Sequence, residues 1–357
     1  MSEELKSYRC PNCDGIISFD SSTQKLKCPS CGTELDVDSV IAFNQLDNEA
    51  PQDHFDWDKI EFEKIDDHEI HSYVCEACGG EIVGDASMAS SSCPYCGNNV
   101  IVEKQFEGIL KPNYILPFKL DKDRAMAEMR NHLKGKVLLP NDFKKKQKLT
   151  KITGVYIPYW LFDCDADGQF RYRAERTQSY RSGDYVITTT DHYLLYREGN
   201  MSFKNVPVDG SNKIEPKVLE ALEPFDFKEL KPFKTAYLQG YLSDRFEADA
   251  NEAKPRANQR IKTSMAQEIS ETTVGYTSVL PTASNVNLQS GRIAYALLPV
   301  WILHSEYKGQ KFIFAMNGES GKFVGDLPID KSKFTVIILA TLAISFVLIL
   351  IATSLFM

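Results

Sequence analysis

Residues 73 to 100 read YVCEACGGEIVGDASMASSSCPYCGNNV, and residues 8 to 35 read YRCPNCDGIISFDSSTQKLKCPSCGTEL. Each stretch holds two CxxC pairs separated by fourteen residues, and the second stretch lies 65 residues after the first. A repeat at a constant offset indicates that one module has been duplicated. The cysteines of the two modules are Cys10, Cys13, Cys28, Cys31, Cys75, Cys78, Cys93 and Cys96.

This cysteine spacing is typical of zinc ribbons. Each CxxC turn directs two thiolates at one ion, and two such turns complete the tetrahedral shell that Zn²⁺ favours. Gly32, Gly79 and Gly97 directly follow a second cysteine, where a permissive backbone helps the turn to close. A redox-active CxxC usually occurs singly and before a helix, so thiol exchange is disfavoured. We therefore expect two structural zinc ions with no open coordination position for a catalytic water.

The C-terminal segment is uniformly apolar. Residues 334 to 357 read FTVIILATLAISFVLILIATSLFM, without charge, proline or glycine. As a helix this segment covers about 36 Å, more than the hydrocarbon core of about 30 Å. Lys331 and Lys333 precede it, which places the N-terminal side in the cytoplasm, and no signal peptide is expected after MSEELKSYRC. The sequence predicts a single-pass tail anchor with cytoplasmic N-terminal domains.

Between the ribbons and the anchor we expect a mixed α+β domain with an internal duplication. IPYWLFDCDADGQF (157–170) resembles LPVWILHSEYKGQK (298–311) at an offset of 141 residues. Each copy is predicted to form a hairpin that turns near Gly168 or Gly309. A helix is expected before each copy, one starting after Asp121 as N-cap and one over about 249–268. The packed face of the second helix is expected to hold the residues that recur at helical spacing, which are Phe246, Ala250, Ala253, Ala257, Ile261, Met265 and Ile269.

The chain is thus predicted to be multidomain. The expected parts are zinc ribbon 1 (1–35), an acidic linker (36–72), zinc ribbon 2 (73–103), the duplicated α+β domain (104–330) and the transmembrane helix (334–357).

The charge of the two ribbons indicates whether they bind protein or nucleic acid. Residues 73 to 100 contain acidic side chains and no Lys or Arg, and an ion bound by four thiolates adds a charge of about −2. Residues 1 to 35 are also slightly acidic. Such modules do not neutralise phosphates, from which most nucleic-acid affinity originates. Protein partners are expected rather than nucleic acid.

Two charged segments each allow two interpretations. In the acidic linker, acids outnumber lysines twelve to two, and the segment is either a spacer or a docking segment that uses residues such as Phe55 and Trp57. Residues 134 to 151 hold seven lysines and one acid. That lysine cluster is either a solvated loop or a contact with anionic lipid headgroups.

No catalytic site is expected. The chain contains no HExxH, GxSxG or GxGxxG motif. Asp163, Asp165 and Asp167 begin like a calcium loop, but the twelfth position is Ala174 instead of Glu. Cys164, the ninth cysteine, is expected to be a small strand residue. We expect no enzyme activity and identify no small-molecule substrate.

The whole arrangement resembles a bacterial family of membrane-tethered, TFIIB-type double zinc ribbon proteins, the YdjG-like proteins of bacilli. The matching motifs are the paired ribbons, the terminal anchor, GVYIPYWLFD (154–163), VPVDGS (206–211) and LPVWILHSEYKGQKFIFAMNG (298–318). The resemblance implies a partnership with a flotillin-like (SPFH) protein and a phage-shock-protein-A homologue in envelope stress.

These features favour a non-enzymatic, membrane-tethered adaptor whose cytosolic zinc ribbons recruit protein partners. The alternative is a membrane-tethered regulator that binds nucleic acid.

Overall fold

The computed structural model describes most of the chain, in segments. These are residues 8–10, 15–41, 53–58, 63, 71–84, 93–98, 101–104, 110–141, 152–307, 310–325 and 327–355. Cys13, most of the acidic linker and residues 142–151 of the lysine cluster lie outside the described residues.

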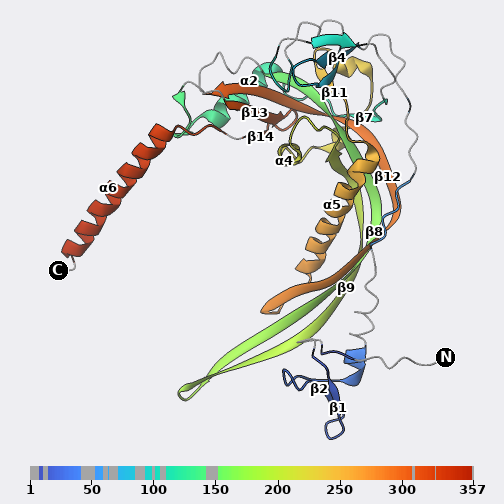
Figure 1. Cartoon of the computed structure of the whole chain (residues 1–357), viewed down its shortest axis with the longest axis vertical. Coiled ribbons are helices and arrows are strands. Elements are labelled where there is room, and N and C mark those ends of the chain that lie inside the picture. The colour runs from blue at the N-terminus through green and yellow to red at the C-terminus, as the bar shows by residue number, and fades with distance from the viewer. Residues whose placement is uncertain are drawn as a thin grey trace. The chain divides into compact units, whose positions relative to one another are not determined.

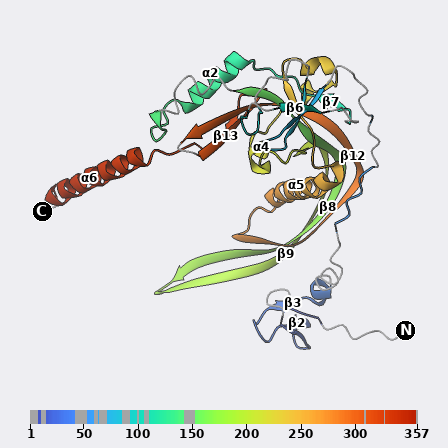
Figure 2. The same ribbon diagram turned by 45° about the horizontal axis from the view of Figure 1, so that its top comes forward.

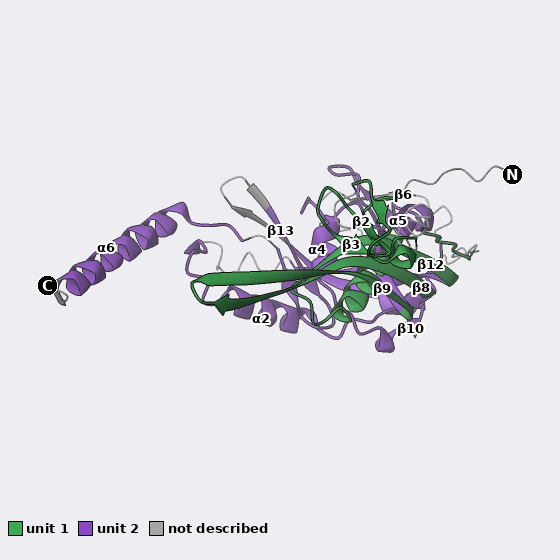
Figure 3. Ribbon diagram, turned by 90° about the horizontal axis from the view of Figure 1, so that it is seen from below, with its two compact units in different colours: residues 1–58, 163–203, 258–291 green, residues 59–162, 204–257, 292–357 purple. Residues whose placement is uncertain are grey.

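The chain divides into two compact units (Figure 3). Unit 1 comprises residues 1–58, 163–203 and 258–291, and unit 2 comprises residues 59–162, 204–257 and 292–357. Long elements begin in one unit and end in the other. The predicted five-part division of the chain stays a prediction.

The described residues form two sheets and four α-helices of at least six residues. The small sheet contains β1 (Ser18–Asp20), β2 (Lys25–Lys27) and β3 (Glu34–Leu35). The helices are α2 (Lys122–Leu133), α4 (Pro216–Ala221), α5 (Ala250–Glu271) and α6 (Lys331–Leu355). The larger sheet contains β4 (His71–Cys75), β5 (Glu81–Gly84), β6 (Ile101–Lys104), β7 (Tyr114–Ile115), β8 (Thr153–Ser182), β9 (Tyr185–Asp209), β10 (Lys231–Pro232), β11 (Leu242–Asp244), β12 (Ser278–Tyr307), β13 (Gln310–Asn317) and β14 (Phe323–Val324).

The larger sheet has the strand order β10-β7-β12-β8-β11-β5-β4-β6, with β9 beside β8 and with β13 and β14 extending from β12. The first part of β8, residues 154–162, is buried on both faces. Successive side chains of a strand point to opposite faces, so both faces of this strand must be covered. Ile157 and Leu161 pack into one core cluster with Leu298 and Ile302. The Trp160 ring lies against the rings of Phe246 and Tyr295 instead.

The two copies of the predicted repeat make equivalent contacts within unit 2. Trp160 donates its indole N–H to the carbonyl of Ala248 at 2.9 Å, and Trp301 donates to the carbonyl of Leu120 at 3.1 Å. Each carbonyl lies two residues before the first residue of a helix, α5 and α2 respectively. The tryptophan of one copy thus binds the start of the helix that precedes the other copy.

The prolines of the two copies repeat this correspondence. The carbonyl of Pro158 accepts from Gly210 N at 2.9 Å, and the carbonyl of Pro299 accepts from Gly318 N at 2.9 Å. Equivalent backbone contacts at both copies support the duplication that was inferred from the sequence.

The predicted hairpin is confirmed in the second copy and wrong in the first. In the second copy β12 pairs with β13 up to Tyr307 opposite Gln310. In the first copy β8 runs straight through Gly168 and continues to Ser182, so the turn to β9 follows at residues 183–184 (Figure 1). A Cβ at Gly168 would lie 2.6 Å from the sulfur of Met265, so this glycine permits close packing of α5 instead of a turn.

Both predicted helices are present. Asp121 caps α2 and accepts the amide hydrogen of Arg124 at 2.8 Å, as expected of an N-cap. α2 packs through Met129 and Leu133 against β13, beside which it lies in Figure 2. The buried face of α5 is the predicted one and includes Ala253, Ala257, Ile261, Met265 and Ile269.

One part of the acidic linker packs on unit 1. Residues 53–58 lie along β12, where His54 N donates to Val286 O at 3.0 Å and Leu288 N donates to His54 O at 2.9 Å. Trp57 is 7% exposed and donates to the side-chain oxygen of Asn258 on α5 at 2.9 Å. Residues 53–58 are therefore an intramolecular docking segment, and not a solvated spacer.

α6 is the one helix of the described chain that is long and apolar enough to cross a membrane. Its candidate span is Lys331–Thr353, 23 residues, and none of the span is buried against the rest of the protein. Asp330 caps its start by accepting the amide hydrogens of Ser332 at 3.0 Å and Lys333 at 3.3 Å. This placement agrees with the predicted transmembrane segment.

Trp57→Ala is expected to release the docking segment, because it removes a buried ring and the hydrogen bond to Asn258. The amides of His54 and Leu288 should then exchange with solvent at least ten times faster, as measured by hydrogen–deuterium exchange and mass spectrometry. Asp56→Ala, at an exposed position of the same segment, is the matched control and should leave exchange unchanged. If these amides exchanged at equal rates in the wild type and in both variants, the docking of residues 53–58 would be contradicted.

Candidate metal centres

The cysteines of ribbon 2 lie on two turns with the same backbone geometry. Cys75 N donates to Gly80 O at 3.0 Å, and Gly79 N donates back to Cys75 O at 2.7 Å. The turn that starts at Cys93 repeats both hydrogen bonds, at 2.7 and 2.9 Å, with Gly97 in the place of Gly79. Gly79 and Gly97 have φ values of +68° and +74°, which only glycine adopts without strain. The glycines predicted to close the turns do so.

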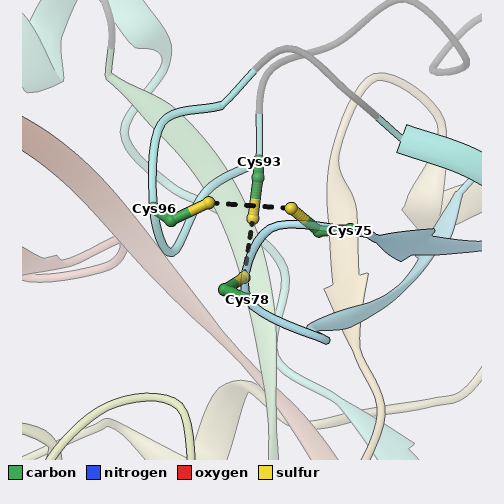
Figure 4. A group of neighbouring side chains, drawn as sticks. All are labelled: Cys75, Cys78, Cys93 and Cys96. Atoms are coloured by element: carbon green, nitrogen blue, oxygen red, sulfur yellow. Dashed lines mark hydrogen bonds between the residues drawn. The ribbon is translucent and has the colours of Figure 1, made fainter.

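The two turns bring four sulfur atoms together, as Figure 4 shows. The Cys75 and Cys96 sulfurs are 3.6 Å apart, the Cys78 and Cys93 sulfurs are 3.6 Å apart, and all four lie within 4.8 Å of one another. Sulfurs at the corners of a tetrahedron with Zn–S bonds of about 2.3 Å would be separated by about 3.8 Å. The spacing therefore fits a single tetrahedral metal ion.

The thiols of this cluster differ in acidity. Burial raises the pKa of Cys75, but hydrogen bonds from the amides of Cys78 and Ala77 outweigh it and lower the pKa to about 7. Burial raises the pKa of Cys93. A metal ligand must be a thiolate, so the lowered pKa of Cys75 favours the form of this side chain that binds metal.

Ribbon 1 repeats the arrangement as far as it is described. Cys10, Cys28 and Cys31 form a second group that can hold a metal ion, with 3.7 Å between the Cys10 and Cys31 sulfurs. Gly32 N donates to Cys28 O at 2.9 Å, the same bond as in ribbon 2. Cys13, the fourth predicted ligand, lies outside the described residues.

The basic side chains of the small sheet are paired with acids. Lys27 Nζ lies 2.8 Å from a carboxylate oxygen of Glu34, and Lys25 Nζ lies 3.8 Å from one of Asp36. Both lysines of β2 therefore face acids instead of standing as free cations.

Ribbon 2 is continuous with the larger sheet. Its strand β5 pairs with β11, with Asp244 opposite Ile82 and Ser243 opposite Val83. Arg245 adds an ion pair with Glu81 at 2.8 Å, within the same unit. Spacing in the sequence did not indicate this connection, because β11 lies about 160 residues after β5.

A buried carboxyl lies where ribbon 2 meets the sheet. Asp244 is 3% exposed and accepts from Ser211 Oγ at 2.5 Å and from Arg245 N at 2.9 Å. Burial raises the pKa of Asp244 to about 7, against the lowering effect of these hydrogen bonds. Burial and the charge of Asp244 also raise the pKa of the Tyr95 hydroxyl, which belongs to ribbon 2. The Asp244 carboxyl therefore carries less than a full negative charge near neutral pH.

The VPVDGS motif supplies a second buried acid to unit 2. Asp209 is 3% exposed and lies 2.6 Å from Arg256, which also contacts Glu220 at 2.7 Å. A buried acid needs such a partner. Asp209 and Ser211 were quoted only as part of a family motif, and nothing in their spacing indicates Arg256 or Asp244.

The acids that resembled a calcium loop do not form one. Asp165 accepts from Ser202 at 2.5 Å, and Asp167 accepts from Gln289. Both lie on the continuous strand β8, so their side chains bond neighbouring strands of unit 1. Cys164 is a buried strand residue, as predicted, and burial raises the pKa of its thiol to about 12.

Comparison with known proteins gives one relative. No family model matches the chain, and no solved structure matches it. The chain is 34% identical over 327 residues to the protein YdjG of Bacillus subtilis (strain 168), which is described as uncharacterized. The match covers 92% of this chain and 91% of the relative, so it extends over almost the full length of both.

Replacing Cys75 and Cys93 with serine is expected to remove one metal ion and to destabilise unit 2. A structural zinc ion contributes on the order of 10 kcal/mol to the fold that holds it, and both cysteines lie in the core cluster of the larger sheet. Elemental analysis should give one zinc per chain instead of two, with increased proteolysis of unit 2. The matched variant, Cys28→Ser with Cys31→Ser, should also hold one zinc but leave unit 2 resistant to proteolysis. Equal proteolysis of unit 2 in the two variants would count against the connection between ribbon 2 and the larger sheet.

Asp244→Asn is expected to change the pH dependence of stability. A carboxyl whose pKa rises from 3.8 to about 7 on folding stabilises the fold below pH 4, and this contribution is lost as pH rises through 7. Relative to the wild type, the asparagine variant should gain about 2 kcal/mol of unfolding free energy between pH 5.5 and pH 7. Denaturant unfolding at several pH values measures this, with the exposed Asp123→Asn as control. If the difference in unfolding free energy between the asparagine variant and the wild type stayed constant with pH, the raised pKa of Asp244 would be refuted.

Proposed function

The chain belongs to the family of the YdjG protein of Bacillus subtilis, and we propose that it is a non-enzymatic, membrane-tethered adaptor that recruits protein partners through two zinc ribbons. α6 would serve as the anchor, with Lys331 and Lys333 on the cytoplasmic side. The ribbons would then lie in the cytosol, where thiols stay reduced and remain available as metal ligands.

Zinc is the metal that suits the two sites. A shell of four thiolates at tetrahedral spacing favours Zn²⁺, and the 3.6 Å sulfur separations in ribbon 2 match it. Four cysteines would fill every coordination position of such an ion, so no water would be left for activation. The ions would therefore have a structural role, which supports a non-enzymatic function.

The observation that carries the choice of protein partners is the charge of the ribbons. Lys25 and Lys27 of ribbon 1 are paired with acids, and residues 73–100 contain no Lys or Arg. Each bound zinc with four thiolates would add a charge of about −2. Phosphate backbones are repelled by such surfaces, whereas basic or polar protein surfaces are not.

The resemblance to the YdjG-like proteins names two candidate partners, a flotillin-like (SPFH) protein and a phage-shock-protein-A homologue, in a response to envelope stress. A cytosolic adaptor fixed to the bilayer by one helix is suited to concentrate such proteins at the membrane.

We expect Cys28→Ser with Cys31→Ser to lose partners but stay in the membrane, because ribbon 1 has its own small sheet and α6 is untouched. After cross-linking in intact cells and detergent extraction, quantitative mass spectrometry should recover the flotillin-like or phage-shock-protein-A-like partner at least five-fold less with the variant. The matched control, Lys25→Gln, keeps all the cysteines and should retain the partner. Unchanged recovery with the cysteine variant would refute recruitment by ribbon 1.

A DNA column distinguishes the adaptor from a nucleic-acid-binding regulator. Purified full-length protein in detergent should flow through at moderate salt. Salt-sensitive retention would replace the adaptor proposal with the regulator.

A further inference from the structure

The segment that follows α2 is attached to the start of α6. Asp330 N donates to Leu138 O at 2.9 Å, and Lys333 Nζ donates to Leu139 O and to the side chain of Asn141, both at 2.8 Å. Leu139 is buried and packs in the same cluster as Leu133 of α2. Residues almost 200 positions apart thus form one junction within unit 2.

The two segments that meet at this junction carry five basic residues. We define them as the basic junction: Arg130, Lys134, Lys136, Lys331 and Lys333. None of the five has an ion-pair partner among the described residues, and Lys333 bonds only neutral oxygens there. Asp330 also belongs to the junction, but its carboxylate accepts backbone amides at the start of α6. Within the described residues 130–141 and 330–333, five Lys and Arg residues therefore accompany one acid.

The position of the basic junction along α6 matches the headgroup layer of a bilayer. The apolar run of α6 starts at Phe334, one helical turn after Lys331. The hydrocarbon core would begin there, and the headgroup region extends about 5–7 Å outward from it. Lys331 lies about 4.5 Å from Phe334 along the helix axis, within this layer. The side-chain bond from Lys333 brings Asn141 to the same level.

An exposed apolar side chain accompanies the charges. Val137 follows Lys136 directly and is 67% exposed. An apolar residue beside lysines is unfavourable in water but suits an interface where apolar atoms enter the acyl boundary and ammonium groups remain among headgroups.

We infer that the basic junction is a binding site for anionic phospholipid headgroups of the membrane in which α6 is anchored, so that the end of α2 contacts the bilayer surface. The inference rests on the proposed membrane anchoring. Residues 142–151 of the lysine cluster lie outside the described residues, and no part of the argument uses them. The site differs from a soluble anion site, because it forms where chain and bilayer meet.

Amine labelling of the full-length protein tests this inference. The protein is placed in nanodiscs of phosphatidylcholine alone or with one third phosphatidylglycerol, and acetylation rates are read for each lysine by mass spectrometry. Lys134 and Lys136 should react about five-fold more slowly in the anionic nanodiscs, and about 0.5 M salt should restore their rates. Lys217, an exposed lysine on α4 of the same unit, is the internal control and should react equally in both. Equal rates for Lys134 and Lys136 in the two nanodiscs would overturn the inference.

A charge-reversed variant provides a second readout. Lys134→Glu with Lys136→Glu should retain several-fold less phosphatidylglycerol than the wild type in native mass spectrometry, whereas Lys217→Glu should retain the same amount. Both lysines of the first variant are exposed, so its fold is expected to persist. Wild-type lipid retention by this variant would also overturn the inference. Release of the wild-type chain from membranes by alkaline extraction would instead refute the anchoring, and the lipid site with it.

Discussion

The burial of β8 on both faces is the constraint on which unit 2 depends. A strand whose side chains are covered on each side needs two layers of partners, and apolar residues at every position need partners of matching shape. Aromatic rings and the start of α5 cover one face, and the core cluster that contains Cys75 and Cys93 covers the other. Metal ligands and ordinary core residues therefore belong to one packed structure.

The parts of the fold that depend on local pattern were predicted from the sequence. The CxxC spacing, the cap at Asp121, the apolar face of α5 and the apolar run of α6 all depend on residues within a few turns of one another. The contacts that join distant segments were not predicted, as with Arg256 and Asp209 or Asp244 and Ser211. The hairpin at Gly168 failed for a related reason. A glycine indicates that a side chain has no room or that the backbone turns, and only the position of Met265 distinguishes the two.

The pairing of β5 with β11 couples ion binding by ribbon 2 to the folding of the larger sheet. A ribbon on a flexible tether binds or releases its ion without consequence for its neighbours, but this one shares a sheet with the rest of unit 2. Ion binding and folding of the sheet are then linked, since whatever orders one favours the other. Ribbon 1 has a sheet of its own, which among the described residues shares no strand with the larger sheet.

Docking of residues 53–58 shortens the tether of ribbon 1. Fully extended, the stretch from residue 36 to residue 72 covers at most about 120 Å, whereas the stretch from residue 36 to the docking segment at residue 53 covers at most about 60 Å. The largest volume that a module can reach grows with the cube of the length of its tether, so docking reduces this upper limit about eight-fold. A protein already bound near the docking segment would meet ribbon 1 at a correspondingly higher local concentration.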